Sequence, residues 1–171
     1  GIVTTFAVVA GVAGASLEPK IVLILGFANL IADGVAMATG NFLGTRSENA
    51  LQAKERAMES WEVANVPDEE RREIRDIYRT KGFKGQDLEA AVRIITSDKK
   101  LWVDEMMVNE LAIIPGEEEN PWKNGLATFV AFIVAGLLPL LPYVFGVEFG
   151  SAFATAVGMT GVALFAVGSA R

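Results

Sequence analysis

Long apolar stretches at both ends of the chain constrain its fold more than any other feature. A helix needs roughly 20 apolar residues to cross a bilayer, and three stretches meet that requirement: Ile21–Leu43, Trp122–Phe145 and Phe149–Ala170. Gly1–Leu17 is also apolar but slightly short. Backbone groups inside a bilayer find no water to bind, so segments of this kind are predicted to be helical. The sequence therefore predicts an all-α, polytopic membrane protein.

Short turn sequences pair the apolar stretches into two transmembrane helical hairpins. Residues 17–20, Leu-Glu-Pro-Lys, separate the first two stretches, and residues 146–148, Gly-Val-Glu, separate the last two. The predicted organisation is a first hairpin over residues 1–44, a helical domain over 45–121 and a second hairpin over 122–171. Because the chain starts on Gly1 inside an apolar stretch, we expect it to be part of a longer protein, without a signal-peptide pattern in these residues.

A charged block, Thr45–Pro121, lies between the hairpins. It holds 12 of the 15 Lys and Arg residues and 18 of the 21 Asp and Glu residues, so the net charge of −6 resides in it. Basic residues beside membrane spans prefer the cytoplasmic side, and Arg46, Lys123 and Arg171 would then all lie there together with the block. The block is accordingly expected to be cytoplasmic.

Helical periodicity and turn residues divide the block into four predicted helices. They are Ser47–Ala64, which continues from the preceding span, then Asp68–Thr80, Gln86–Ile95 and Asp98–Ile113, the last ended by Pro115 and Gly116. No strand pattern and no nucleotide-binding glycine loop are visible in the sequence. We therefore expect a small packed helical domain and no nucleic-acid partner.

Five glutamates in this block lack adequate basic neighbours on their own helices. Residues three or four apart share a helix face, and exposed acids usually have a basic residue at that spacing. Glu62, Glu70, Glu73 and Glu110 have none, and Glu59 has only Arg56, with Glu55 and Glu62 opposing it. Clustered carboxylates repel one another, and a divalent ion would relieve that repulsion. The alternative for Glu70 is that acids in a first helical turn complement the helix dipole.

Two methionines stand beside the last of these acids, in the sequence Met106-Met107-x-x-Glu110. A mixture of carboxylates and thioethers favours iron(II) or another transition metal over magnesium or calcium, although both methionines could equally be core residues. The chain has no Cys and no His, which excludes disulfides, zinc fingers, His-based catalytic sites and the Glu-x-x-His pattern of di-iron carboxylate proteins. An enzyme is therefore the least favoured class, and no prosthetic group is expected.

A polar stripe runs through the second apolar stretch. Asn29, Asp33, Met37 and Asn41 recur every four residues, and Asp33 falls near the middle of the span. A charge at that depth costs about 2.5–3.5 kcal/mol on insertion scales and usually faces a pathway or a partner. Asp33 and Met37 are therefore predicted to contact a passing cation, with Asp33 able to exchange a proton. The alternative is a protonated Asp33 hydrogen-bonded between helices.

The last apolar stretch carries a face of small residues, composed of Gly150, Ala154, Gly158 and Gly161. Small residues let helix backbones approach closely inside membranes. This face is predicted to be a helix-packing surface.

Four segments of the sequence form a recognisable set: GIVTTFAVVAGVAGAS at the start, ANLIADGVAMATGNFLGTRSE in the second span, and VPDEE and LWVDEMMVNEL in the charged block. Together they resemble the vacuolar iron transporter family, which includes CCC1-like iron and manganese transporters. The resemblance extends over essentially the whole chain. It implies a homodimer with five transmembrane helices per subunit and a cytoplasmic helical metal-binding domain, which exchanges iron(II), and in many members manganese(II), against protons.

Position by position, the resemblance assigns the family's metal ligands to residues of this chain. The cytoplasmic ligands match Glu59, Glu62, Glu70, Glu73, Met106, Met107 and Glu110, and the membrane-pathway methionine matches Met37. The plant-type transporters have a Glu at the position of Asn29, one turn from Asp33, and the resemblance implies that Asp33 substitutes for it. Their first-span Asp would immediately precede Gly1, and their fifth helix would follow Arg171.

Two functions from different classes agree with these patterns. The first is proton-coupled transport of iron(II), manganese(II) or both out of the cytoplasm, across a prokaryotic plasma membrane or a eukaryotic vacuolar membrane. The second is a membrane-anchored buffer or sensor that binds divalent ions without moving them. The ligand types accept iron, manganese, cobalt and zinc alike, so they do not rank these metals.

Overall fold

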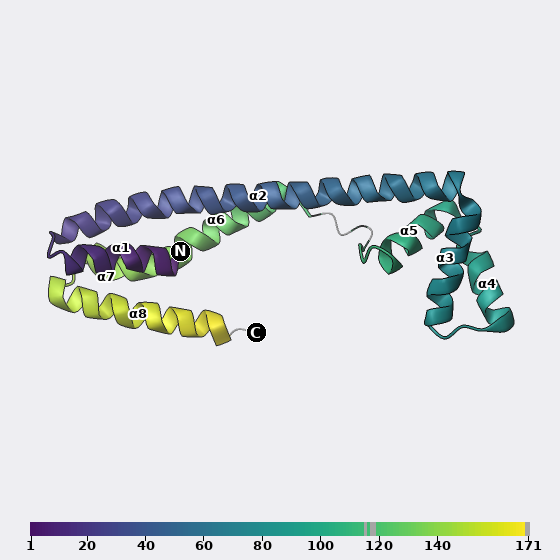
Figure 1. Ribbon diagram of the computed structural model, residues 1–171. Helices are drawn as coiled ribbons and strands as arrows, with labels where there is room; N and C mark the ends of the chain where they lie inside the picture. The colour runs from purple at the N-terminus through teal and green to yellow at the C-terminus, as the bar shows by residue number, and fades with distance from the viewer. Residues whose placement is uncertain (115, 117–118, 170–171) are drawn as a thin grey trace. The chain divides into compact units, whose positions relative to one another are not determined.

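The computed structural model describes residues 1–114, 116 and 119–169, excluding the side chain of Phe149 (Figure 1). Throughout these residues the backbone forms helices joined by turns and short connections, without a β-strand. The chain divides into two compact units: an apolar unit, Gly1–Thr45 with Asn120–Arg171, and a charged unit, Arg46–Glu119. Helix α2, Pro19–Asn65, is continuous and contributes residues to both. This confirms that the helix of the second apolar stretch continues into the charged block.

The apolar unit contains the helices that are long and apolar enough to span a membrane. Its elements are α1 (Ile2–Gly14), the first part of α2, α6 (Pro121–Leu137), η1 (Leu138–Leu140), α7 (Leu141–Val144) and α8 (Phe149–Ser169). In the described residues, α2, Pro121–Val144 and Gly150–Ser169 meet the length and composition of a membrane span. Helix α1, with 13 residues, is the shorter apolar helix that the sequence led us to expect. A helical membrane protein is the resulting fold class.

Two prolines change the helix geometry near the end of the third apolar stretch. Helix α6 ends at Leu137, Pro139 lies in the 3₁₀ turn η1, and Pro142 lies in the first turn of α7. Proline lacks the amide proton of a regular helical hydrogen bond and fits best in a first turn. The stretch is therefore helical throughout but consists of three successive segments.

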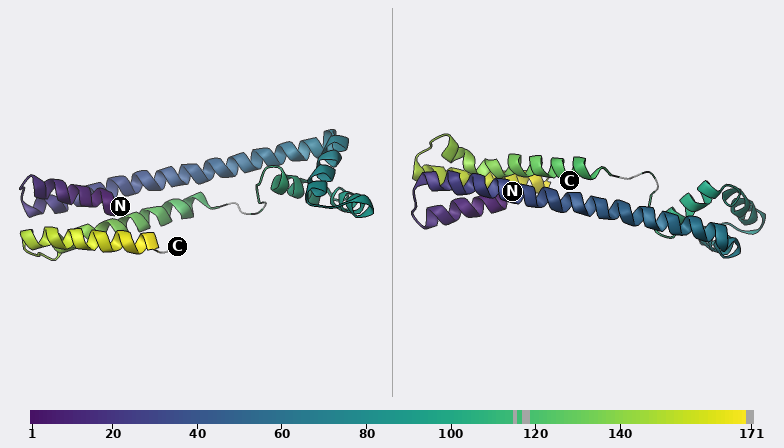
Figure 2. Two further views of the ribbon diagram at one scale, coloured as in Figure 1. Left: turned by 60° about the horizontal axis from the view of Figure 1, so that its bottom comes forward. Right: turned by 90° about the horizontal axis from the view of Figure 1, so that it is seen from above.

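Glycines allow the helices of the apolar unit to approach closely. A Cβ atom built on Gly136 of α6 would lie 2.3 Å from Leu30 Cδ2 of α2 and 3.1 Å from Thr5 Oγ1 of α1. Helix α1 also packs against α8, and the two run side by side in Figures 1 and 2. The buried core of this unit is formed by Val9, Val12, Val22, Leu30, Leu140, Tyr143, Ala152 and Ala156.

The predicted packing face of the last span is wrong for the contacts within this chain. Cβ atoms built on Gly150, Gly158 and Gly161 would meet nothing within 4 Å. The buried face of α8 is instead formed by Ala152, Ala156 and Thr160. Both faces carry small residues at helical spacing, so the sequence pattern did not distinguish which one turns inward.

The charged unit is a small helical domain with its own core. The end of α2 joins α3 (Pro67–Thr80), α4 (Gly85–Ile95) and α5 (Lys99–Asn109). Pro67 begins α3 in the first-turn position, and the Asp98 side chain caps α5 by accepting the Leu101 amide proton at 2.8 Å. The core consists of Val63, Ile74, Leu88, Val92, Ile95, Trp102, Val103, Met106 and Met107. The helices expected at Asp68–Thr80 and Gln86–Ile95 are thereby confirmed to within one residue at each end.

Helix α5 is shorter than the predicted Asp98–Ile113. It ends at Asn109, and Glu110 is its C-cap. Ala112 adopts a left-handed conformation with φ of +55°, and the Ile113 amide donates to the Met107 carbonyl at 2.9 Å. This bond joins residues that are six apart, and a left-handed residue after a helix is most often glycine. Alanine there gave no sequence signal, and the predicted stop at Pro115 lies outside the described residues.

Candidate metal site

The five glutamates singled out by the sequence come from three helices of the charged unit. Glu59 and Glu62 lie on α2, Glu70 and Glu73 on α3, and Glu110 at the end of α5. Glu59 and Glu70 are buried, with 4% and 5% of their surface exposed, Glu62 is half-buried, and Glu73 and Glu110 are exposed. We refer to these five residues as the glutamate cluster.

No member of the glutamate cluster forms an ion pair or a side-chain hydrogen bond with any described residue. The Oε2 atoms of Glu59 and Glu70 are buried without a hydrogen-bond partner among the described atoms. A buried carboxylate oxygen without a partner is costly, because it has lost its water and gained nothing in return. Such oxygens are suited to coordinate a cation that comes from solution.

The arginines of the charged unit that lie close in sequence to the cluster bind other acids. Arg56 pairs with Asp104 at 2.5 Å, Arg71 with Asp68 at 3.0 Å, Arg72 with Glu69 at 3.4 Å, Arg75 with Glu89 at 2.9 Å, and Arg79 with Asp76. Arg56 was the one basic residue at helical spacing from the cluster, and it pairs with Asp104 and forms no ion pair with Glu59. The cluster is therefore left without a protein cation in the described structure.

Burial and repulsion between carboxylates raise the pKa values of three members of the cluster, Glu59, Glu70 and Glu110. Burial, followed by the charges of Glu110 and Glu70, raises the pKa of Glu59 to about 7. Burial, followed by the charges of Glu73 and Glu62, raises the pKa of Glu70 to about 7. The pKa of Glu110 is also raised, by burial first and then by Glu73 and Glu62. These mutual effects place the five carboxyl groups in one electrostatic environment.

The carboxylates share this environment without forming a closed coordination shell. Among the described residues, no three acidic side chains converge closely enough to hold one ion. Met106 and Met107 are fully packed in the core, at 0% and 2% exposed, and the Glu110 amide donates to the Met106 carbonyl at 2.9 Å. Both methionines are therefore core residues that also lie next to the cluster along α5. Closure around an ion would require the carboxylate side chains to move together.

The polar stripe of α2 divides into residues with different environments. Asn29 and Asp33 are half-buried, the Asn29 Nδ2 atom is buried without a described partner, and Met37 is 54% exposed. Asn41 differs, because its side-chain amide donates to Thr128 Oγ1 at 2.5 Å and to the Asn124 carbonyl at 3.3 Å, both on α6. Asn41 therefore links two helices and does not continue the open part of the stripe.

Asp104 and Glu105, which the sequence patterns did not single out, connect α5 to its neighbouring helices. Asp104 binds Arg56 of α2, and Glu105 accepts a hydrogen bond of 2.6 Å from the Tyr78 hydroxyl of α3. Asp104 and Glu105 are adjacent in sequence and reach two different helices. The sequence offered one indication of the Arg56–Asp104 contact: Arg56 is the lone basic neighbour of Glu59 on α2.

Comparison with known proteins identifies the family of the chain. The family model of the VIT family matches residues 1–171. A vacuolar iron transporter of Toxoplasma gondii is 39% identical over 100% of this chain and 60% of its own length, and one of Plasmodium falciparum is 35% identical over 84% of this chain and 54% of its own length. Vacuolar iron transporter 1 of Oryza sativa is 32% identical over 98% of this chain and 67% of its own length. The chain thus spans a little more than half of the first two relatives. It belongs to the VIT family.

Proposed function

We propose that the protein containing this chain exports iron(II), manganese(II) or both from the cytoplasm in exchange for protons. The glutamate cluster is the observation that carries this proposal, since it combines buried carboxylates, adjacent methionines and no protein cation. Its ligand types accept iron, manganese, cobalt and zinc. The relatives are named as iron transporters, which supports iron as the cargo and a transporter, not an enzyme, as the class.

In this proposal the charged unit is the cytoplasmic metal collector. Glu59, Glu62, Glu70 and Glu73 supply carboxylate oxygens, and Glu110, Met106 and Met107 complete the ligand set. Carboxyl groups with pKa values near 7 bind either a proton or a metal ion at cytoplasmic pH. That competition is a physical basis for coupling metal binding to proton release.

The proposed membrane pathway begins with Asp33 and Met37 of α2, with Asn29 one turn away from Asp33. A carboxylate and a thioether four residues apart lie on one helix face, where both can contact the same ion. Asp33 also supplies a group that can carry the counter-transported proton.

The test is iron(II) uptake by proteoliposomes that contain the full-length protein, driven by a pH gradient under anaerobic conditions. The double variant Asp33→Asn with Met37→Leu is expected to abolish uptake. The matched control is Val35→Leu, which changes an exposed apolar residue of the same helix. Unchanged transport in the double variant would refute the pathway assignment, and manganese, cobalt and zinc added as competitors would rank the cargo.

The same proteoliposome assay distinguishes transport from the alternative function, a membrane-anchored metal buffer or sensor. All seven collector residues belong to the charged unit, so they could bind ions without any flux. A buffer predicts stoichiometric metal binding with no uptake that depends on the pH gradient. The half-buried Asp33 in the apolar unit favours transport, since a buffer does not need an acid there.

We also propose that the protein works as a homodimer, with the end of α2 in the interface. Leu51, Met58 and Trp61 are large exposed apolar residues that share one face of α2. A stripe with this spacing is typical of a helix that packs against another helix. Because the chain has no cysteine, the variant Met58→Cys would give specific disulfide cross-linking between two copies, and Lys54→Glu, which reverses a charge between Leu51 and Met58, should weaken association. A monomer that does not cross-link would exclude this interface.

We propose that the protein is an integral, multi-pass protein of the plasma membrane or the vacuolar membrane. The relatives are named for the vacuole, and a plasma membrane is the corresponding place in a prokaryotic cell. The positive-inside rule puts Lys123 and the charged unit on the cytoplasmic side. Cysteine labelling of Ser47→Cys from each side of sealed vesicles would test this orientation.

A further inference from the structure

Arg56 occupies a position from which it could neutralise the glutamate cluster. It lies three residues before Glu59 on α2, and no other Lys or Arg lies three or four residues from a cluster member within the same helix. Residues at this spacing are neighbours on the helix surface, with roughly 5–6 Å between their Cβ atoms. A guanidinium there would normally be expected to pair with the carboxylate.

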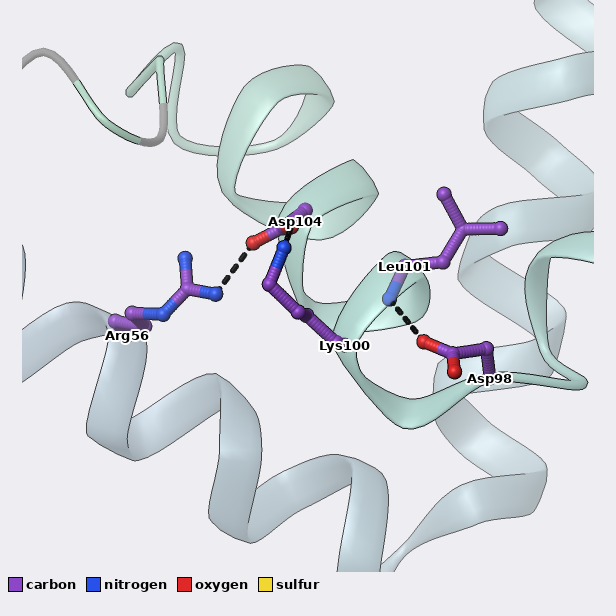
Figure 3. Close-up of polar contacts among 5 residues, drawn as sticks. All are labelled: Arg56, Asp98, Lys100, Leu101 and Asp104. Carbon is purple, nitrogen blue, oxygen red and sulfur yellow. Dashed lines mark hydrogen bonds and ion pairs between the residues drawn. The ribbon is translucent and has the colours of Figure 1, made fainter.

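The structure commits Arg56 to a different acid. Its Nη2 atom donates to Asp104 Oδ1 of α5 at 2.5 Å, and Lys100 approaches the other oxygen, Oδ2, at 3.2 Å (Figure 3). Both partners are partly shielded from water, with 38% of the Arg56 side chain and 24% of the Asp104 side chain exposed. An ion pair in this setting is screened less than one on the open surface.

From this arrangement we infer that Asp104 is a positioning residue that holds Arg56 away from Glu59 and so keeps the glutamate cluster available to a divalent ion. The inference rests on the proposed metal binding by the cluster. Four more arginines of the charged unit, Arg71, Arg72, Arg75 and Arg79, each bind an acid outside the cluster, so the same division of charges extends along α3.

If Asp104 has this role, replacing Asp104 and replacing Arg56 should affect metal binding differently. Asp104→Asn breaks the pair and leaves a free guanidinium one turn from Glu59, where it repels a divalent ion. Arg56→Gln breaks the same pair but leaves no cation. If the pair served only to tether α5 to α2, both variants would have the same effect.

The experiment measures cobalt(II) binding to the full chain in detergent or nanodiscs, by titration and by the visible absorption bands of the bound ion. We expect the cobalt(II) Kd of D104N to be about tenfold higher or more, because a positive charge one helical turn from Glu59 repels a divalent ion strongly. The Kd of R56Q is expected within about threefold of the original chain, and the double variant D104N/R56Q should match R56Q. The conservative variant Asp104→Glu should retain tight binding.

The outcomes separate this inference from the proposed function. Equal weakening in D104N and R56Q would reduce the pair to a tether and overturn the inference while leaving metal binding intact. No cobalt(II) binding by the original chain would overturn the inference and the metal-collecting function together. Circular dichroism checks folding: D104N unfolded beside a folded, metal-binding double variant supports the inference, whereas unfolding of all three variants assigns the pair to structure and overturns it.

Discussion

The Tyr78 hydroxyl of α3 donates a hydrogen bond of 2.6 Å to Glu105 Oε1 of α5. The same oxygen accepts a second hydrogen bond, from the Asn109 side chain at 2.8 Å, and Lys81 lies 3.6 Å from it. Burial, and then the bond to Glu105, raises the pKa of Tyr78 to about 12, so the hydroxyl keeps its proton at physiological pH. This contact joins the helix that carries Glu70 and Glu73 to the helix that carries both methionines.

Replacing Tyr78 with Phe is expected to loosen α5 from α3. A hydrogen bond to a charged group contributes about 1.5–3 kcal/mol, and Glu105 keeps Asn109 and Lys81, so we expect a loss of about 1–2 kcal/mol. Hydrogen exchange of the α3 and α5 amides would show it as faster opening of both helices. Thr80→Val is the control, because the Thr80 hydroxyl donates within α3, to the Asp76 carbonyl, and has no partner on another helix among the described residues. Unchanged exchange in Tyr78→Phe would contradict the prediction.

Stability of the metal-free chain should fall as the pH rises. The pKa values of Glu59 and Glu70 are raised to about 7 in the folded state, from about 4.5 in an unfolded chain. Their neutral forms are thus favoured by folding: the stabilisation is fully present below pH 4.5 and is lost as the pH rises through 7. The expected loss of folding free energy is roughly 1–3 kcal/mol per carboxyl group. The losses of Glu59 and Glu70 are not independent, because the two carboxylates repel each other.

Thermal unfolding followed by tryptophan fluorescence between pH 5 and pH 8 would test this dependence. The double variant Glu59→Gln with Glu70→Gln should flatten it. Glu89→Gln serves as the control, since Glu89 is exposed and its hydrogen bond and ion pair with Arg75 lower its pKa, whereas those of Glu59 and Glu70 are raised. A melting temperature that rises steadily from pH 5 to pH 8 would exclude the proposed protonation of the cluster.

Metal binding should release protons near neutral pH. With pKa values of about 7, Glu59 and Glu70 are each about half protonated at pH 7, so one bound ion should displace about one proton in total. Calorimetric titration with manganese(II) in two buffers of different ionisation enthalpy measures this number directly. At pH 8.5 the release should approach zero, and release that is independent of pH would show that other groups are displaced.

Close helix packing should make Gly136 intolerant of substitution. An added Cβ would lie 2.3 Å from Leu30 Cδ2 and 3.2 Å from the Gly1 carbonyl oxygen, so Gly136→Val should cost about 1–3 kcal/mol. Gly161→Val is the matched control, because nothing lies within 4 Å of its Cβ position. Thermal stability in detergent would report the difference. Equal stability of the two variants would disprove this packing.

The sequence identified the glutamate cluster through local spacing, and it could do so because helical neighbours are fixed by the periodicity of the backbone. It could not show that Arg56 binds Asp104, 48 residues away, because that contact depends on how α2 and α5 pack. For the same reason it placed Asn41 in the open polar stripe, although its amide is bound to Thr128 of α6.

The sequence by itself determined the helical class, the apolar stretches and, to within one residue at each end, the limits of α3 and α4, because hydrophobic periodicity, proline and glycine act locally. Only the tertiary structure decided which glutamates are buried, which face of α8 turns inward, and where α5 ends. Each of these depends on contacts between helices: burial of Glu59 and Glu70 requires several helices around them, and Ala152 and Ala156 face inward because α1, η1 and α7 pack there. The left-handed Ala112 that closes α5 has no residue-type signal, so its conformation came from the folded chain alone.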